Sequence, residues 1–524
     1  MAFLIRCSAA CRRLLLAALL LPALALGASP ADFIALCYHE VERDGSASLT
    51  KTAVTAGDLA AQFAWLKASG YQPVSLQQIL DARQDGPALP PKAVLLTFDD
   101  GRRDVFTRVL PLLRMFNYPA LVALVGSWLD VPAGGTVDYD GTPQPRENFV
   151  TWEEVREMQR SGLIEIASHS YDLHRGVLAN PQGNTQPAAI TRRYESGRYE
   201  TDEAYLKRIR DDLARNRDLI VRKTGVAPRV IVWPYGRSNG AAQQIASELG
   251  MPVGMTLEDG TNTAKTPLVT IKRFLIEDTP SLQSYAEAVR LRWEPNPRRS
   301  VRVVPSAWTD AEAGLSQALD QLQRIAPNIA FVDPRAVGDA VLFPTTHRVV
   351  AADRLNHTAW QIERRAGVPV FIDLPAAWLG DHQLLADLAR HVNFAGLRLP
   401  VAPGDPAATA TIETLHRWRW PLTVVYAPAV ASPADDWQRL PAGDLVLMPE
   451  RDVRSRVVPQ EARRRLLIEF DAASVTPAEA ADIAATMRSL DADGYRQFGL
   501  DTLPASGFEP VWRELSLRSQ PLLP

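Results

Sequence analysis

The sequence predicts an α/β protein built on parallel strands, and three observations support this prediction. Short apolar runs that suit buried strands recur through the first half of the chain. Segments with helical periodicity or helix caps separate these runs. Polar residues follow directly after several of the runs. Regular alternation of strands and helices implies a parallel sheet, and a (β/α) barrel is the economical way to close it.

The individual elements are predicted from periodicity, caps and breakers. Leu59, Phe63 and Leu66 share one face of a helix. A capping box begins another helix at Thr151, and Gly225 closes a long amphipathic helix. The predicted strands are 33–38, 94–98, 119–125, 163–167, 230–233 and 252–257, and the longer predicted helices are 202–224 and 239–249.

Composition divides the chain into three parts. Residues 1–28 have the features of a secretory signal peptide, because a basic start precedes a short apolar run and a small-residue exit. An uncleaved anchor is the alternative. Pro-rich, charged residues 293–300 mark a seam between two domains, which are expected at 30–292 and 301–524. No later segment is apolar enough for a membrane span.

Charge and cysteine content narrow the class of function. The formal net charge is −3, and cleavage after the signal peptide would remove three arginines and leave a net charge of −6. An acidic chain does not suit nucleic acid or another polyanion, and it suits a neutral or cationic polymer better. Cys37 would be the single cysteine of the mature chain, which therefore folds without an internal disulfide.

Two adjacent carboxylates follow the predicted strand 94–98. Side chains of neighbouring residues point in different directions, so Asp99 and Asp100 can hold different roles, one as a metal ligand and the other as a base. The alternative is an Asx turn in which Gly101 supplies the bend.

Two histidines follow the predicted strand 163–167. His169 and His174 are five residues apart, which does not place them on one helical face but suits a strand end and the loop after it. Each could instead be an ordinary core or surface histidine. Together with one aspartate they would form a three-ligand site with open positions, which is typical of a catalytic metal.

These segments resemble the polysaccharide deacetylases of carbohydrate esterase family 4, which carry NodB-like domains. Thr97–Gly101 resembles their aspartate motif and His169–His174 their histidine motif. Cys37–Val41 and Val232–Gly236 resemble segments of the PgaB-type poly-β-1,6-N-acetyl-D-glucosamine N-deacetylases. The resemblance covers roughly residues 32–290 and implies a distorted (β/α) barrel whose motif order is circularly permuted.

The resemblance also implies a role for each residue of the site. Asp99 would be the general base, His39 would protonate the departing amine, and the backbone N–H of Tyr235 would stabilise the oxyanion. The ligands of a divalent cation (Zn²⁺, or Fe²⁺, Co²⁺ or Ni²⁺) would be Asp100, His169 and His174.

Two features of the turn at 232–236 stay open. Many family members have an arginine before this turn that orients the base, whereas this chain has Val232 and Trp233 there. Arg229 and Arg237 are nearby, but neither matches. Trp233 has two interpretations, a substrate-binding residue that stacks on a sugar or a core aromatic at a strand end.

Residues 301–524 resemble, more loosely, the second half of the PgaB-type proteins. The resemblance implies a degenerate glycoside-hydrolase-like (β/α) domain, shortened relative to a full barrel. The stretch 394–401 has no carboxylate where the family has an acidic pair, and glycoside hydrolysis needs two placed carboxyl groups. Asp333, Asp373 and Glu469 are expected in caps or salt bridges rather than in a groove. A polymer-binding role is therefore expected.

The function expected from the sequence is metal-dependent removal of N-acetyl groups from a secreted β-1,6-linked poly-N-acetylglucosamine. The expected compartment is the periplasm, where the activity would aid polymer export and biofilm matrix formation. Expected partners are the polysaccharide and an outer-membrane export protein, with no nucleic acid and no stable membrane insertion after signal cleavage. Two alternatives remain, a non-catalytic polymer-binding export factor and a bifunctional deacetylase and glycoside hydrolase.

Overall fold

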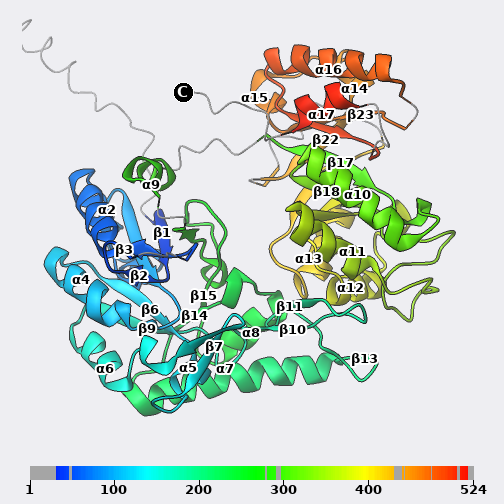
Figure 1. Cartoon of the computed structure of the whole chain (residues 1–524). Coiled ribbons are helices and arrows are strands. Elements are labelled where there is room, and N and C mark those ends of the chain that lie inside the picture. Colours follow the sequence, from blue (N-terminus) through cyan, green and yellow to red (C-terminus); the bar gives the residue numbers. More distant parts are fainter. Residues whose placement is uncertain are drawn as a thin grey trace, which may run out of the picture.

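The structure is a computed structural model of the whole chain, shown in Figure 1. It describes residues 31–46, 50–277, 280–290, 297–429, 440–441, 443–473, 475–503 and 508–516. The predicted signal peptide and most of the predicted seam lie outside these residues. Within them, none of the helices combines the length and the apolar character that a bilayer crossing requires.

The first half of the chain forms a curled parallel sheet of eight strands. Its spatial order is β15-β14-β9-β6-β5-β1-β16, and β4 pairs with β5 in addition. The first strand of the chain thus lies inside the sheet, as a permuted order requires. The strands are β1 (Phe33–Tyr38), β4 (Gln72–Pro73), β5 (Ala93–Phe98), β6 (Ala120–Leu124), β9 (Ile164–Ser168), β14 (Val230–Val232), β15 (Val253–Met255) and β16 (Phe274–Leu275).

The sheet remains open between β15 and β16, so the expected barrel is distorted into a half-barrel. Among the described residues, one isolated β-bridge, between Met255 at the end of β15 and Ile271 shortly before β16, connects the two sides of this opening. The side chain of Arg273 continues across the gap, because its Nε donates a hydrogen bond to the carbonyl of Thr256 at 3.0 Å. Two backbone hydrogen bonds of Ile271 and the Arg273 side chain thus take the place of the longer strand ladder that would close a full barrel.

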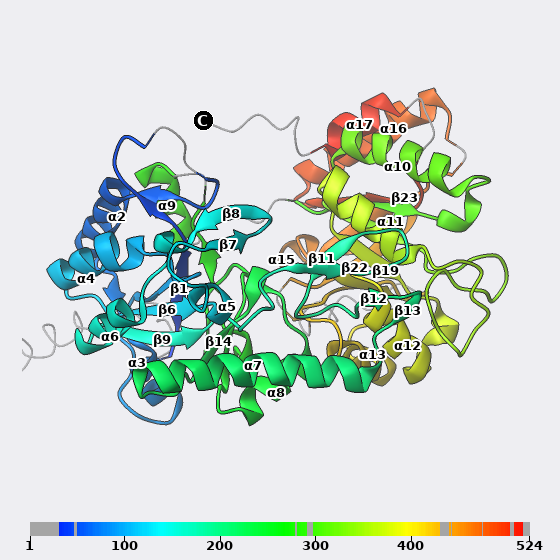
Figure 2. The ribbon, with the colours of Figure 1, turned by 60° about the horizontal axis from the view of Figure 1, so that its bottom comes forward.

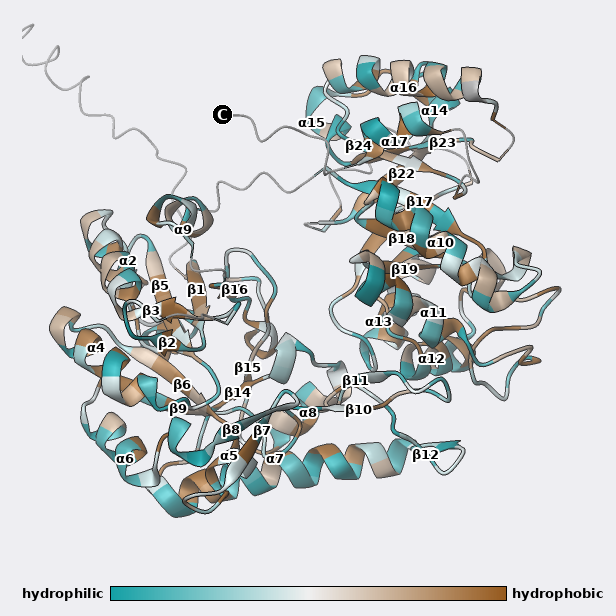
Figure 3. Ribbon diagram, in the orientation of Figure 1, coloured by the Kyte–Doolittle hydropathy of each residue, from teal (hydrophilic) through white to brown (hydrophobic). Residues whose placement is uncertain are grey.

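Helices cover the outer face of this sheet, as the sequence predicts. The capping box at Thr151 and the left-handed Gly225, with φ of 78°, both lie where expected. Figure 3 shows apolar residues concentrated on the strands and on the inner faces of these helices. The helices are α2 (Ala56–Ala68), α3 (Leu76–Arg83), α4 (Leu110–Phe116), α5 (Gly126–Leu129), α6 (Trp152–Arg160), α7 (Asp202–Thr224), α8 (Gly240–Glu248) and α9 (Leu282–Val289).

Short two-stranded additions surround the carboxyl ends of the strands. The pair β2 (Val41–Glu42) and β3 (Val54–Thr55) is parallel, and the other three pairs are antiparallel. The antiparallel pairs are β7 (Thr136–Tyr139) with β8 (Thr142–Pro145), β10 (Gly176–Leu178) with β11 (Thr185–Pro187), and β12 (Tyr194–Glu195) with β13 (Arg198–Tyr199).

The second half forms a closed barrel of eight parallel strands. The predicted (β/α) barrel is confirmed, and its ring of strands is complete. Its reduced size shows in some connections, since only two four-residue helices, α14 and α15, lie between β22 and β23. The strands are β17 (Arg299–Val303), β18 (Ile329–Val332), β19 (Val370–Asp373), β20 (Gly396–Leu399), β21 (Thr423–Tyr426), β22 (Leu445–Pro449), β23 (Leu466–Phe470) and β24 (Gln497–Leu500).

Helices on the outside of the second barrel complete the (β/α) pattern. Phe331 and Phe371 fill the barrel interior, with ring centroids 6.0 Å apart in an edge-to-face arrangement. The helices are α10 (Ala311–Ile325), α11 (Leu355–Gln361), α12 (His382–His391), α13 (Pro406–His416), α14 (Glu450–Val453), α15 (Gln460–Arg463), α16 (Pro477–Ala492) and α17 (Glu509–Leu515).

The two domains share one hydrophobic core. The long helix α7 extends from the first sheet to the second barrel (Figure 2), where Asp202 pairs with Arg390 at 2.9 Å. The Arg192 guanidinium lies 3.7 Å from the Tyr205 ring centroid and 4.3 Å from that of Trp418. Because buried apolar residues of both domains belong to the same cluster, the barrel is packed against the first domain rather than tethered to it.

Candidate active site

Residues from four strands meet at the carboxyl edge of the first sheet. His39 follows β1, Asp99 and Asp100 follow β5, and His169 follows β9. Tyr235 follows β14 in a short turn with φ of 57°. The carboxyl ends of parallel strands share one edge, so residues distant in sequence converge there. The structure brings together the residues that the sequence analysis selected.

Asp100, His169 and His174 form a compact buried triad. The Nε2 atoms of His169 and His174 lie 3.3 and 3.5 Å from Oδ1 of Asp100. Two ligands of one tetrahedral ion, each about 2.1 Å from it, are roughly 3.4 Å apart. The three side chains are at most 8% exposed, and their ligand atoms lie within 4.8 Å of one another. This donor set fits a divalent cation.

The protonation of His169 supports the same interpretation. Its Nδ1 lies 2.7 Å from the carbonyl oxygen of Val232, which can only accept a hydrogen bond. Nδ1 therefore carries the proton, and in the neutral ring Nε2 presents its lone pair to the carboxylate of Asp100. Two electron-rich atoms face each other at 3.3 Å, an arrangement that a shared cation stabilises.

Groups around the triad position its ligands. The Tyr139 hydroxyl donates to Oδ2 of Asp100 at 2.5 Å, which leaves Oδ1 directed at the histidines. Burial by itself would raise the pKa of Asp100, but its contact with His169 and the other nearby histidines hold that pKa far below its usual range. On the other side, Asp140 Oδ1 lies 3.4 Å from Nδ1 of His174 and accepts a hydrogen bond from the Tyr235 hydroxyl.

Asp140 is expected to strengthen metal binding although it is not a ligand. Burial lowers the pKa of His174, yet the contact with Asp140 and the charge of Asp100 leave that pKa raised. Removing the charge in Asp140→Asn is expected to weaken metal affinity about 10- to 100-fold, because the ring loses its anchor. Titration with Zn²⁺ against a competing chelator measures this. Asp138→Asn on the same hairpin is the control, and equal affinities in the two variants would contradict the assignment.

Arg273 holds the second carboxylate of the pair, Asp99. Its two terminal nitrogens lie 2.7 and 2.9 Å from the two carboxylate oxygens, and both side chains are buried. Burial would raise the pKa of Asp99, but the charge of Arg273 keeps that pKa below its ordinary value. Asp99 is therefore ionised, fixed in orientation and outside the triad, as a general base requires.

Arg273 was not predicted from the sequence. The two arginines near the 232–236 turn, where an orienting arginine was expected, are engaged elsewhere. Arg229 pairs with Glu165 and Arg237 with Glu363. Arg273 precedes β16, which pairs with β1, and β1 pairs with β5, the strand that Asp99 follows. In the sequence, Arg273 stands directly before the apolar residues Phe274 and Leu275, a position typical of a strand start. Nothing in the sequence places this arginine next to Asp99.

His39 lies beside Asp99, and its Nδ1 is a buried atom without a hydrogen-bond partner in the described part of the chain. Cys37, His39 and Asp99 also lie close enough to form a second group of ligand types. This group suits a metal poorly. Arg273 occupies both oxygens of Asp99, and burial raises the pKa of the Cys37 thiol, so a thiolate ligand is disfavoured.

The suggestion that Trp233 stacks on substrate is wrong. Its side chain is 0% exposed and packs in the core that joins the two domains, so neither ring face is free for a sugar. The turn after β14 instead directs the next aromatic, Tyr235, toward a groove that it lines together with His174 and Asp140. The predicted role of the Tyr235 backbone N–H stays a prediction.

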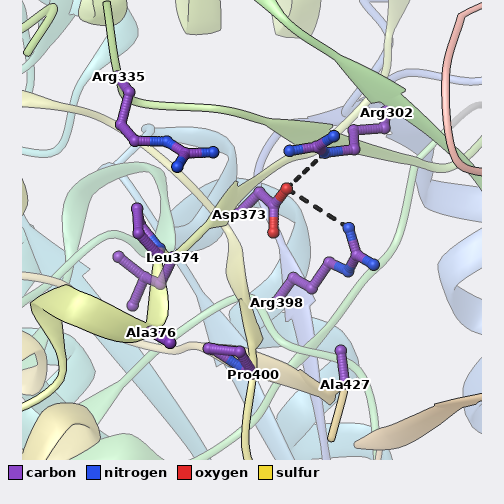
Figure 4. Close-up of a pocket in the computed structure, with 9 residues that line it drawn as sticks. Arg302, Arg335, Asp373, Leu374, Ala376, Arg398, Pro400 and Ala427 are labelled. Carbon is purple, nitrogen blue, oxygen red and sulfur yellow. Dashed lines mark hydrogen bonds and ion pairs between the residues drawn. The ribbon is translucent and has the colours of Figure 1, made fainter. Parts of the chain in front are cut away.

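The mouth of the second barrel contains carboxylates, and arginines engage Asp333, Asp373 and Glu469. Figure 4 shows Asp373 between Arg302 and Arg398. β20 lies in the stretch 394–401, where the resembling family has its acidic pair, and it presents Arg398 to the mouth instead. The salt bridging predicted for Asp333, Asp373 and Glu469 is thus confirmed, whereas Asp501, which follows β24, accepts a hydrogen bond from the Ala472 N–H. The pairs are Arg302–Asp373 (2.5 Å), Arg302–Asp333 (3.2 Å), Arg335–Asp333 (2.7 Å), Arg398–Asp373 (3.4 Å) and Arg398–Glu469 (3.1 Å).

The fold and the first-domain site indicate a class of protein, a hydrolase with a candidate three-ligand metal site on a curled parallel sheet. Residues 86–254 match the family described as polysaccharide deacetylase. Over 356 residues the chain is 38% identical to the poly-beta-1,6-N-acetyl-D-glucosamine N-deacetylase of Escherichia coli (strain K12). The aligned region covers 66% of this chain and 53% of that protein. The chain thus spans about half the length of this curated relative.

Two solved structures are similar to the first domain. A de-N-acetylase from Aggregatibacter actinomycetemcomitans is 38% identical, covers 49% of this chain and 99% of its own, and has a TM-score of 0.47. The BpsB deacetylase domain from Bordetella bronchiseptica is 44% identical, with 48% and 97% covered and a TM-score of 0.44. Residues 86–254 thus carry a polysaccharide deacetylase domain.

Proposed function

We propose that this chain hydrolyses N-acetyl groups of poly-β-1,6-linked N-acetylglucosamine, releasing acetate and leaving free amines on the polymer. The observation that carries the proposal is the buried triad of Asp100, His169 and His174 next to the ionised, arginine-held Asp99. The similarity to deacetylases of this polymer supports the choice of substrate.

The residues around the triad divide the chemistry of amide hydrolysis. A divalent cation bound by the triad supplies Lewis acidity toward water and the acetamide carbonyl. Asp99 accepts the proton of the attacking water, and Arg273 keeps its carboxylate ionised and aimed. The Tyr235 N–H donates to the developing oxyanion. His39 gives a proton to the nitrogen as the C–N bond breaks, because an unprotonated amine is a poor leaving group.

The site suits several metals. One carboxylate and two imidazoles are acceptable ligands for Zn²⁺, and also for Fe²⁺, Co²⁺ and Ni²⁺. The availability of each ion in the compartment decides which of them the protein carries.

The location follows from the N-terminal 28 residues. We propose that they direct secretion across the inner membrane and that the mature protein works in the periplasm. There it would modify the polymer on its way to an outer-membrane export protein and so contribute to a biofilm matrix. The domain at 30–292 would deacetylate, and the domain at 301–524 would bind polymer without cutting it, because Asp333, Asp373 and Glu469 at its mouth are tied to arginines.

One assay separates this function from its alternatives. The mature chain is supplied with each metal, and free amine and chain length are measured on β-1,6-linked N-acetylglucosamine oligomers. We expect amine release at constant chain length, loss of activity on chelation and recovery when metal is returned. His174→Gln is expected to lose metal and activity, whereas His382→Gln on α12 is the matched control.

Two outcomes would favour the alternatives. Polymer binding without amine release under any metal would favour a non-catalytic export factor. Shortened chains would show that the second barrel still hydrolyses glycosidic bonds.

A further inference from the structure

A groove of about 900 Å³ runs from the metal triad to the second domain. His174, Asp140 and Tyr235 line it at the deacetylase end. Trp360 and Glu363, from α11 and the turn that follows it, line it at the other end. This volume is near the upper end of small-molecule sites, which span about 300–1,000 Å³, and is larger than one acetamide group requires.

The two walls of the groove are fixed relative to each other. The β10–β11 hairpin begins two residues after His174 and reaches the barrel beside α11 (Figure 2). Its Gln186 side chain donates to Oδ1 of Asn356 at 3.0 Å, and Nδ1 of His357 lies 2.7 Å from Oδ1 of Asn184. These contacts are buried, so the deacetylase site and α11 behave as parts of one surface.

Trp360 is held in place in the wall of this groove. Its indole N–H donates to the carbonyl of Thr185 at 3.0 Å, and the side chain is half-buried. The ring therefore keeps one orientation while part of it faces the groove. Aromatic rings pack well against sugar rings, and a ring fixed in advance loses little conformational entropy on binding.

The charges along the groove favour a neutral ligand. Glu363 accepts a hydrogen bond from Asn393 at 3.0 Å and lies 3.4 Å from the Arg237 guanidinium, so its carboxylate is compensated. Three acids and three arginines line the groove in all: Asp138, Asp140, Glu363, Arg175, Arg237 and Arg364. The balance suits an acetylated sugar rather than a sugar that carries an ammonium group.

We propose that Trp360 forms a sugar-binding subsite of the deacetylase. It takes one N-acetylglucosamine unit while a neighbouring unit of the same chain presents its acetamide to the triad. The second domain thereby completes the substrate groove of the first and makes the enzyme selective for oligomers. This inference rests on the proposed function.

The test compares a pentamer with a monomer on the full-length mature protein. Trp360→Leu keeps apolar packing but removes the aromatic face, and Trp360→Phe restores a face without the N–H. We expect the ratio of kcat/KM for the β-1,6-linked N-acetylglucosamine pentamer to that for the monomer to fall about tenfold in Trp360→Leu. Trp360→Phe should recover most of it, and Arg365→Ala, outside the groove lining, should leave the ratio unchanged.

Calorimetry with the pentamer on the chelator-treated protein separates the two levels of inference. Weaker pentamer binding in Trp360→Leu, with no amine release by the wild type under any metal, would end the proposed function but keep the subsite. An unchanged kcat/KM ratio together with unchanged pentamer affinity in Trp360→Leu would overturn the subsite.

Discussion

Asparagine in place of Asp99 is expected to lower kcat for amine release by about 10²–10⁴-fold, the usual contribution of a general base, while the protein keeps its metal. Asparagine has nearly the same shape as aspartate, and its amide oxygen can still accept a hydrogen bond from Arg273. The amide cannot accept a proton at neutral pH. The triad itself is unaltered, because Asp99 is not one of its ligands. Steady-state rates on the pentamer and the metal content of the purified variant measure both halves of this expectation.

A control for this substitution is available on α7. Asp211→Asn makes the same chemical change at an exposed carboxylate that pairs only with Lys207, so kcat should not change. Amine release by Asp99→Asn within a few fold of the wild type would remove Asp99 as the base. Loss of metal together with activity would show instead that Asp99 helps to bind the ion.

Arg273→Gln is expected to cause the largest loss of stability among single changes at the site. It leaves the carboxylate of Asp99 buried without a countercharge, and breaking a buried pair typically costs about 3–5 kcal/mol. Denaturant unfolding at neutral pH measures the free energy of unfolding. Arg229→Gln removes a half-exposed pair with Glu165 and should cost about 1 kcal/mol or less. Similar losses in the two variants would contradict a special role for Arg273.

The same variant should change the dependence on pH. In the wild type the pKa of Asp99 is lowered, so the pair stabilises the fold above the unfolded pKa of about 3.9, and this contribution is lost as pH falls through the folded pKa. Without Arg273, burial dominates and raises the pKa of Asp99 above the unfolded value. The acid limb of kcat/KM should then move to higher pH, and the stability difference from the wild type should narrow as pH falls. Unfolding curves and rate profiles across pH give both trends.

Local sequence determined much of the first domain. Helix caps such as Thr151 and Gly225, and the apolar runs of the strands, depend on residues within a few positions of one another. Asp99 and Asp100 are adjacent in the chain, and His169 and His174 share one loop, so their motifs are visible without a structure. Parallel strands then bring these motifs to one edge, and that convergence was predictable from the alternation of elements alone.

Tertiary structure decided what distant side chains do. Arg273 is 174 residues from Asp99 in the sequence and reaches it because the strand that follows it, β16, pairs with β1, and β1 pairs with β5. Trp233 and Trp360 are both tryptophans of the interdomain region, yet packing buries the first and leaves part of the second facing the groove.

The second barrel shows the same division between sequence and structure. The resemblance of its segments to those of a known family implied a barrel of this type, whereas closure of the ring set Asp333, Asp373 and Glu469 against arginines. Ion pairing and burial depend on distances through space, which a linear pattern does not specify. The sequence alone thus determined the class of chemistry and its main residues. The fold decided which side chains hold those residues in place and which side chains line the groove beside them.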